Sequence, residues 1–123
     1  MNSTKNFLLI SSDKQFCLYA KTTALTLTKL NVQATIDMTD DEAEAIKISD
    51  SQNLNTILLD LDIETLNPLS FIRKVRENAT SSKVKIISFS GKSINRREVF
   101  DAGCDSIMTK KEIETILPNI IQF

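Results

Sequence analysis

The sequence predicts an α/β protein in which a doubly wound parallel sheet of five strands is covered by five helices. Two observations support this fold class. Short apolar runs alternate with amphipathic segments along the chain, as expected when parallel strands are joined by right-handed helical crossovers. The run from Thr56 to Leu59, bounded by Asn55 and by acids, consists of β-branched or large apolar residues, which is typical of a strand buried on both faces.

The first two predicted strands flank a helix. Residues 6–11 form an apolar run that predicts a buried strand, and Ser12 or Asp13 is placed to cap the helix that follows. Residues 31–37 alternate apolar and polar side chains, as a half-buried or edge strand does. The helix between them is indicated by apolar residues at intervals of three or four, namely Phe16, Ala20, Ala24, Leu27 and Leu30.

Two more helix starts lie before and after the central strand. Thr39 is followed three residues later by Glu42, a capping-box spacing that predicts a helix through Ser49. After the strand, Asn67 supplies a cap and Pro68 the first-turn position of another helix.

The fourth strand and helix are bounded by glycines. Residues 84–90 form an apolar run that predicts a strand, which Gly91 closes. Residues 93–102 predict a weaker helix ended by Gly103, because glycine suits the left-handed conformation at a helix end.

The last strand is predicted at residues 105–109. The capping-box spacing of Thr109 and Glu112 then opens the final helix. Pro118 lies inside this helix, so a kink or break is expected near Leu117.

Length and composition predict a single domain, residues 1–123, with one core. No apolar run approaches the roughly 18 residues of a membrane span. The run after Lys5 is too short for a signal peptide, so we expect a cytoplasmic protein that binds no membrane. Two cysteines, Cys17 and Cys104, predict no disulfide framework. The chain has no histidine, which removes the commonest general base and zinc ligand.

Charge is unevenly distributed, although the net charge is only -1. Residues 37–64 contain nine acids and one base, Lys47, whereas bases such as Arg96 and Arg97 gather later. Solvated helix faces are the favoured interpretation, and a docking surface is the alternative. The small net charge gives no reason to expect nucleic-acid binding.

Polar groups follow four of the five predicted strands. A flavodoxin-like strand order of 2-1-3-4-5 makes the first, third, fourth and fifth strands neighbours, so residues 11–13 meet Asp60, Ser90 and Lys110 at one edge of the sheet. These groups suit phosphoryl chemistry. The carboxylate can accept a phosphoryl group, the hydroxyl and the ammonium can bind the phosphoryl oxygens, and a hard cation can neutralise their charge.

These residues give the chain a resemblance to the response-regulator receiver domain, the CheY-like family, over nearly its whole length. The similar segments are Ile57-Leu58-Leu59-Asp60, Ile86-Ile87-Ser88-Phe89-Ser90-Gly91 and Ala102-Gly103-Cys104-Asp105-Ser106-Ile107-Met108-Thr109-Lys110. The resemblance implies that Asp60 is the phospho-acceptor, Ser90 the switch hydroxyl and Lys110 the phosphate-contacting lysine. It places Asp62 where the family uses a backbone carbonyl as a metal ligand.

The chain departs from the family at the metal site. Receivers carry an acidic pair after the first strand, where this chain has Ser11 and Ser12, with Asp13 one position late. Mg²⁺ normally takes one or two carboxylates, so we expect its binding and the phosphorylation of Asp60 to be weakened or lost, as in a degenerate receiver, or pseudo-receiver. A residual metal site would use Asp60, Asp62 and Asp13, although a helix cap is the favoured role of Asp13.

Two further departures lie near the last strand. The family's aromatic switch position is Ile107 here, and the proline usual after the lysine is Lys111. One alternative is that Lys110 pairs directly with Asp60 and stands in for the missing cation.

The resemblance implies a signalling module whose output is protein binding, with a histidine kinase as a candidate partner. In the family the output surface is formed by the fourth helix, fifth strand and fifth helix, here residues 93–102, 105–109 and 112–123. Two versions remain open, one switched through Asp60 and one that binds its partner constitutively.

A phosphohydrolase of the haloacid-dehalogenase type is the alternative from another functional class. Asp60 and Asp62 resemble the nucleophile and general acid of its first motif, but Ile63 replaces the following glycine. That family also needs an acidic metal site beyond the lysine, and only two glutamates of the last helix follow Lys110. We therefore do not expect an enzyme. The apolar residues 120–123 predict either the packed end of the last helix or a homodimer seam, and a domain cut from a longer chain is also consistent with the sequence.

Overall fold

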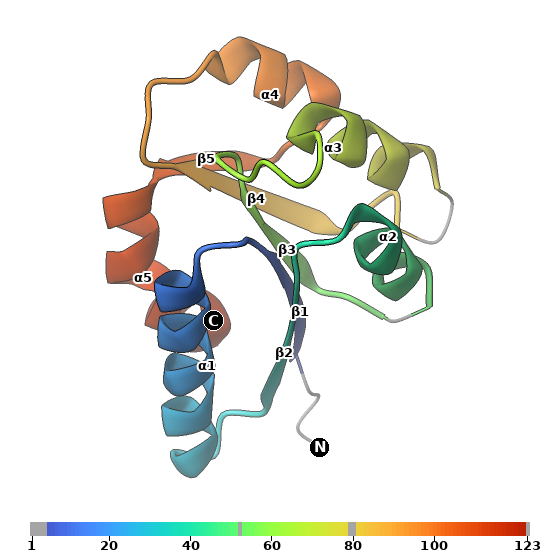
Figure 1. Cartoon of the computed structure of the whole chain (residues 1–123). Helices are drawn as coiled ribbons and strands as arrows, with labels where there is room; N and C mark the ends of the chain where they lie inside the picture. The colour runs from blue at the N-terminus through green and yellow to red at the C-terminus, as the bar shows by residue number, and fades with distance from the viewer. Residues whose placement is uncertain (1–4, 52, 79–80, 123) are drawn as a thin grey trace.

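The computed structural model describes residues 5–51, 53–78 and 81–122, which form a parallel sheet with helices on both faces (Figure 1). The strands are β1 (Lys5–Ile10), β2 (Ala34–Thr39), β3 (Thr56–Asp60), β4 (Lys85–Ser90) and β5 (Ser106–Thr109). The helices are α1 (Lys14–Lys29), α2 (Glu42–Ser51), α3 (Pro68–Glu77), α4 (Arg96–Ala102) and α5 (Lys110–Gln122). The strand order is β2-β1-β3-β4-β5, so the predicted fold class and strand order are confirmed.

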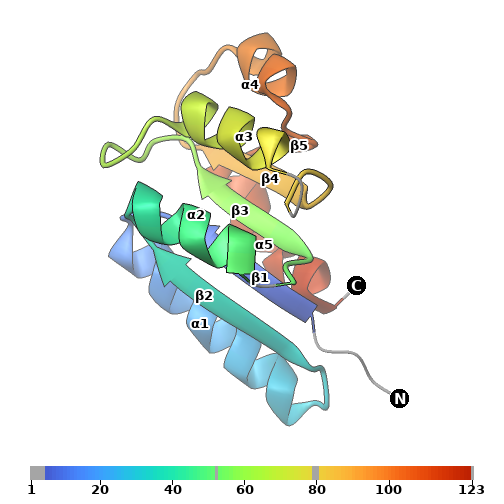
Figure 2. The same ribbon diagram turned by 90° about the vertical axis from the view of Figure 1, so that its right-hand side faces the viewer.

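The helices form two layers around the central strand β3 (Figures 1 and 2). Leu58 of β3 packs in a cluster with α1 and α5, whereas Ile57 and Leu59 pack in a second cluster with α2, α3 and α4. Every residue of β3 is buried, as predicted for a strand covered on both faces. Each fully buried side chain of this kind contributes about 1.5–3 kcal/mol to folding, so β3 anchors the core.

Local capping residues fix most of the helix ends. The predicted capping box of α5 is complete: Glu112 N–H donates to Thr109 Oγ1, and Thr109 N–H donates to Glu112 Oε1, both at 3.0 Å. Asn67 caps α3 as predicted. Asn95 caps α4, which is therefore shorter than the predicted range 93–102. Gly103 ends α4 with a φ of 122°, the left-handed conformation predicted for it.

Two predicted boundaries around β2 are wrong. Asn31 has a φ of 70° and its N–H donates to the carbonyl of Thr28, so it closes the end of α1 instead of starting a strand at residue 31. At the other end of β2, Asp41 Oδ2 accepts the N–H of Glu44 at 2.9 Å, whereas Thr39 Oγ1 accepts only the N–H of Asp41. Asp41 is thus the residue that caps α2.

Of the kink or break predicted near Leu117, the break is wrong, because α5 is continuous through Pro118. Proline has no N–H to donate to the carbonyl four residues earlier, which belongs to Glu114. The Tyr19 hydroxyl of α1 donates to that carbonyl at 2.5 Å. A contact between two helices therefore replaces the hydrogen bond that the proline removes.

The end of α5 packs into the core through Ile121, which is fully buried, while Phe123 lies outside the described residues. Cys17 and Cys104 are free thiols. Among the described residues, no helix combines the length and apolar character needed to cross a lipid bilayer.

Candidate functional site

The carboxyl ends of four neighbouring strands meet at one edge of the sheet. The register pairs Ile10 with Leu59 and Ser90 with Thr109, so the residues that follow these positions lie side by side. The structure thereby brings the predicted groups of β3, β4 and the start of α5 to the same edge, next to residues 11–13.

Asp60 is buried, with 5% of its surface exposed, and both of its carboxylate oxygens have a donor. The Ser11 hydroxyl donates to Oδ2 at 2.7 Å, and the N–H of Asp62 donates to Oδ1 at 2.9 Å. Residues 11–13 were predicted to lie at the same edge as Asp60, but a direct hydrogen bond to Asp60 was not predicted for Ser11. Its position directly after β1, next to the end of β3, is the signal that would have revealed it.

Asp62 binds the loop between β4 and α4. Its Oδ1 accepts the Ser90 hydroxyl at 2.5 Å, and its Oδ2 accepts the N–H of Gly91 at 2.8 Å. The N–H of Lys92 donates in turn to Ser90 Oγ at 3.0 Å. Ser90 therefore lies at the site as predicted, but its direct partner is Asp62 and not Asp60.

Lys110 forms an ion pair with Asp13, so the suggested direct pair between Lys110 and Asp60 is wrong. Asp13 also accepts the N–H groups of Gln15 and Phe16, which confirms its predicted role as the cap of α1. The hydrogen bond from Lys110 is the main cause that lowers the pKa of Asp13. The same hydrogen bond raises the pKa of Lys110, while burial opposes this and the nearby charge of Asp60 adds to it.

The carboxylates predicted as metal ligands do not converge. Asp13 holds an ammonium and Asp62 holds two loop donors, so neither presents a free oxygen beside Asp60. In the part of the chain that the structure describes, no group of three or more Asp, Glu, His or Cys side chains is arranged to hold a metal ion. The described side chains therefore do not fit a Mg²⁺ ion, which prefers a cluster of oxygen ligands.

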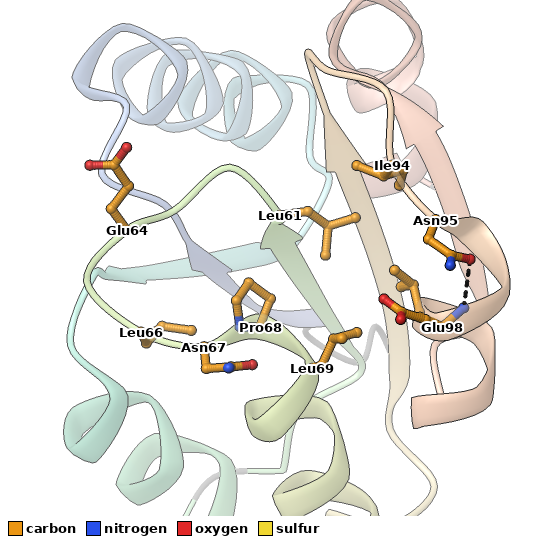
Figure 3. Close-up of a pocket in the computed structure, with 10 residues that line it drawn as sticks. Leu61, Glu64, Leu66, Asn67, Pro68, Leu69, Ile94, Asn95 and Glu98 are labelled. Atoms are coloured by element: carbon orange, nitrogen blue, oxygen red, sulfur yellow. Dashed lines mark hydrogen bonds between the residues drawn. The ribbon is translucent and has the colours of Figure 1, made fainter.

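A cleft of about 550 Å³ lies beside the carboxylates, between the start of α3 and α4 (Figure 3). Leu61, Leu69 and Ile94 line it with aliphatic side chains, and Glu64 and Glu98 add carboxylates. Because Leu61 lies between Asp60 and Asp62, one short segment forms part of both the carboxylate site and the cleft. The sequence did not predict this cleft.

Several solved structures share this fold. The receiver domain of a sensor histidine kinase from Pseudomonas aeruginosa, solved with a magnesium ion coordinated in its active-site cleft, has a TM-score of 0.79 and 19% identity over 98% of this chain and 96% of that chain. The phosphorylated cyanobacterial phytochrome response regulator RcpA has a TM-score of 0.76 and 18% identity over 98% of this chain and 90% of that one. The chemotaxis protein CheY4 of Vibrio cholerae has a TM-score of 0.77 and 14% identity over 98% of each chain.

No curated protein sequence matches this chain at a significant level. The family model described as the response regulator receiver domain matches residues 8–122, a range that contains all four strand ends of the site. These comparisons give no support to the phosphohydrolase alternative. Together with the strand order and the polar groups gathered at the strand ends, they show that the chain belongs to the response regulator receiver domain family.

Proposed function

We propose that this receiver domain acts in two-component signalling through protein-protein interaction, and that phosphoryl acceptance by Asp60 is weakened or lost. In this proposal the domain is a pseudo-receiver that binds its partner without being switched by a histidine kinase. It has no catalytic turnover of its own.

The proposal is supported by one observation: the carboxylates of the site are already bound by hydrogen-bond donors and an ammonium of the protein itself. Transfer of a phosphoryl group to a carboxylate depends on positive charge that offsets the charge of the transferred group, supplied in this chemistry by a hard cation. Here the ammonium of Lys110 is held by Asp13, and the buried oxygens of Asp60 receive neutral donors from Ser11 and from the N–H of Asp62. Phosphorylation would have to break these contacts with no acidic pair available to recruit a cation.

For the output surface we propose the face formed by α4, β5 and α5. Phe100 of α4 is 46% exposed, and Arg97 lies in the same helix with an almost fully exposed side chain. Arg96 donates to the carbonyl of Ile107 at 3.5 Å, which links the basic start of α4 to β5. An exposed aromatic ring beside two arginines suits a partner with acidic and apolar side chains. A second copy of the chain is the alternative occupant of this face.

The test is intact-mass measurement after incubation with Mg²⁺ and acetyl phosphate. We expect the wild type and Asp60→Ala to remain at their unmodified masses under conditions in which a receiver that has the acidic pair is phosphorylated. A phosphate adduct that forms on the wild type to the same extent as on that receiver, and that is absent from Asp60→Ala, would overturn the proposal.

A further inference from the structure

We propose that Asp62 is a built-in anionic ligand of the loop between β4 and α4. Its carboxylate fills an oxyanion site made by the Ser90 hydroxyl and the Gly91 N–H, so the loop is held in an anion-bound arrangement without a phosphoryl group. The inference rests on the proposed function, because it names what occupies the switch when Asp60 is not phosphorylated.

The geometry is that of a two-point anion site. Each oxygen of the Asp62 carboxylate takes one donor, from Ser90 at 2.5 Å and from Gly91 at 2.8 Å. Hydrogen bonds to an ionised carboxylate are shorter and about twice as strong as those between neutral groups. The N–H of Lys92 donates to Ser90 Oγ at 3.0 Å, which leaves the hydroxyl proton for an acceptor. The alternative acceptor, the carbonyl of Lys92, is more distant at 3.3 Å.

Asp62 is not an ordinary turn cap. A capping aspartate binds N–H groups two or three residues ahead in its own segment. Asp62 binds donors 28 and 29 residues away, in a loop that follows a different strand. The local role belongs to Asp60, whose Oδ1 accepts the N–H of Asp62. The carboxylate of Asp62 is therefore free to act as a ligand across the sheet edge.

The surroundings of Gly91 show why an anion suits this position. A Cβ atom at Gly91 would lie 3.5 Å from Asp62 Oδ2 and 3.9 Å from Cδ of Lys110, so the carboxylate and the stem of a cationic side chain both approach the glycine. The Ser90 hydroxyl and the Gly91 N–H are donors of the kind that stabilise an oxyanion. A phosphoryl oxygen on Asp60 would compete with Asp62 for these donors.

The inference predicts that removing the Asp62 carboxylate opens the site to an external oxyanion. The experiment is a titration of ¹⁵N-labelled protein with inorganic phosphate at constant ionic strength, using wild type, Asp62→Ala and a matched control, Asp37→Ala. Asp37 lies on the edge strand β2, at the opposite side of the sheet from β4. We expect saturable shifts of the Gly91 and Lys92 amide signals in Asp62→Ala only. Equal, non-saturating shifts in all three proteins would overturn the inference, as would saturation of the wild type.

Amide hydrogen exchange gives a second readout that needs no added ligand. The Gly91 amide should exchange roughly 10- to 100-fold faster in Asp62→Ala than in wild type, because it loses a hydrogen bond to a charged acceptor. In Asp62→Asn, which keeps the shape of the side chain, the exchange rate of the Gly91 amide should lie between those of wild type and Asp62→Ala. Unchanged exchange at Gly91 in both variants would contradict the inference.

The two proposals fail in different ways. A phosphate adduct on Asp60 of the wild type, formed to the same extent as on a receiver that has the acidic pair, would refute the proposed function whatever the titration shows. An unresponsive Gly91 in Asp62→Ala, with no adduct on the wild type, would refute the role of Asp62 alone.

Discussion

Ser11 directly follows β1, and its replacement by alanine measures what its hydroxyl contributes to the stability of the fold. Its hydroxyl donates to Asp60 Oδ2 at 2.7 Å, and Asp60 is only 5% exposed, so water has poor access to the oxygen that would lose its donor. A hydrogen bond to a charged group contributes about 1.5–3 kcal/mol when its loss leaves a buried acceptor unsatisfied. We expect Ser11→Ala to lower the free energy of unfolding by that amount.

The expected change is measurable by thermal and urea unfolding. With about 2.1 cal/mol/K of unfolding entropy per residue, a chain of 123 residues loses about 4 °C of Tm per kcal/mol, which gives a decrease of about 6–12 °C. Ser12→Ala is the matched control, because Ser12 is exposed, and it should change the free energy by less than about 0.5 kcal/mol.

A double-mutant cycle with Asp60→Asn separates this contact from other effects of the substitution. If Ser11 stabilises the fold through the carboxylate of Asp60, Ser11→Ala should lower the unfolding free energy by less in the Asp60→Asn background than in wild type. The coupling energy between the two substitutions should then be about 1 kcal/mol or more. Equal losses for Ser11→Ala and Ser12→Ala, or a coupling near zero, would refute the reasoning.

Three further predictions concern other contacts of the fold. The hydrogen bond from Lys110 is the main cause that lowers the pKa of Asp13 below 3.8, so the ion pair stabilises the fold above the unfolded-state pKa, and this stabilisation is lost as pH falls through the lowered value. Lys110→Met should therefore lose less unfolding free energy than wild type between pH 6 and pH 2, about the range that the direction of the shift indicates. Urea unfolding across this range measures the difference. Tyr19→Phe should lower the unfolding free energy by about 0.5–1.5 kcal/mol, because the carbonyl of Glu114 loses its donor. The loss should be smaller in a Pro118→Ala background, where the N–H of residue 118 can donate to that carbonyl. Equal losses in both backgrounds would contradict this. Gly103→Ala should lower the unfolding free energy by about 1–2 kcal/mol, because Gly103 has a φ of 122° at which alanine is strained, and an unchanged urea midpoint would be the opposite result.

Some features of this fold that depend on neighbouring residues in the sequence were predicted correctly, although the capping box predicted at Thr39 was wrong. The unbroken apolar character of β3 marks a strand buried on both faces, and the capping box at Thr109 is made by residues three apart. The flavodoxin-like strand order is one of two common orders for a doubly wound parallel sheet, and the structure has it. Adopting this order predicted that Asp60, Ser90 and Lys110 meet at one edge.

The partners of the site residues could not be predicted in the same way. Lys110 has a long, flexible side chain, and the choice between Asp13 and Asp60 depends on three-dimensional distances and not on spacing in the sequence. The continuity of α5 at Pro118 likewise depends on a hydroxyl from α1, distant in the chain. Sequence patterns therefore identified which groups meet, while the pairing among them required the coordinates.

The central claim is that the acids at the strand ends are held by the protein's own donors and do not form a cation site. Paramagnetic broadening by Mn²⁺, a spectroscopic substitute for Mg²⁺, tests it directly on ¹⁵N-labelled wild type. The account predicts that the amide signals of Asp13, Asp60 and Asp62 weaken no more than that of Asp37 on the distant edge strand. Selective loss of these three signals at low Mn²⁺ concentration would contradict it.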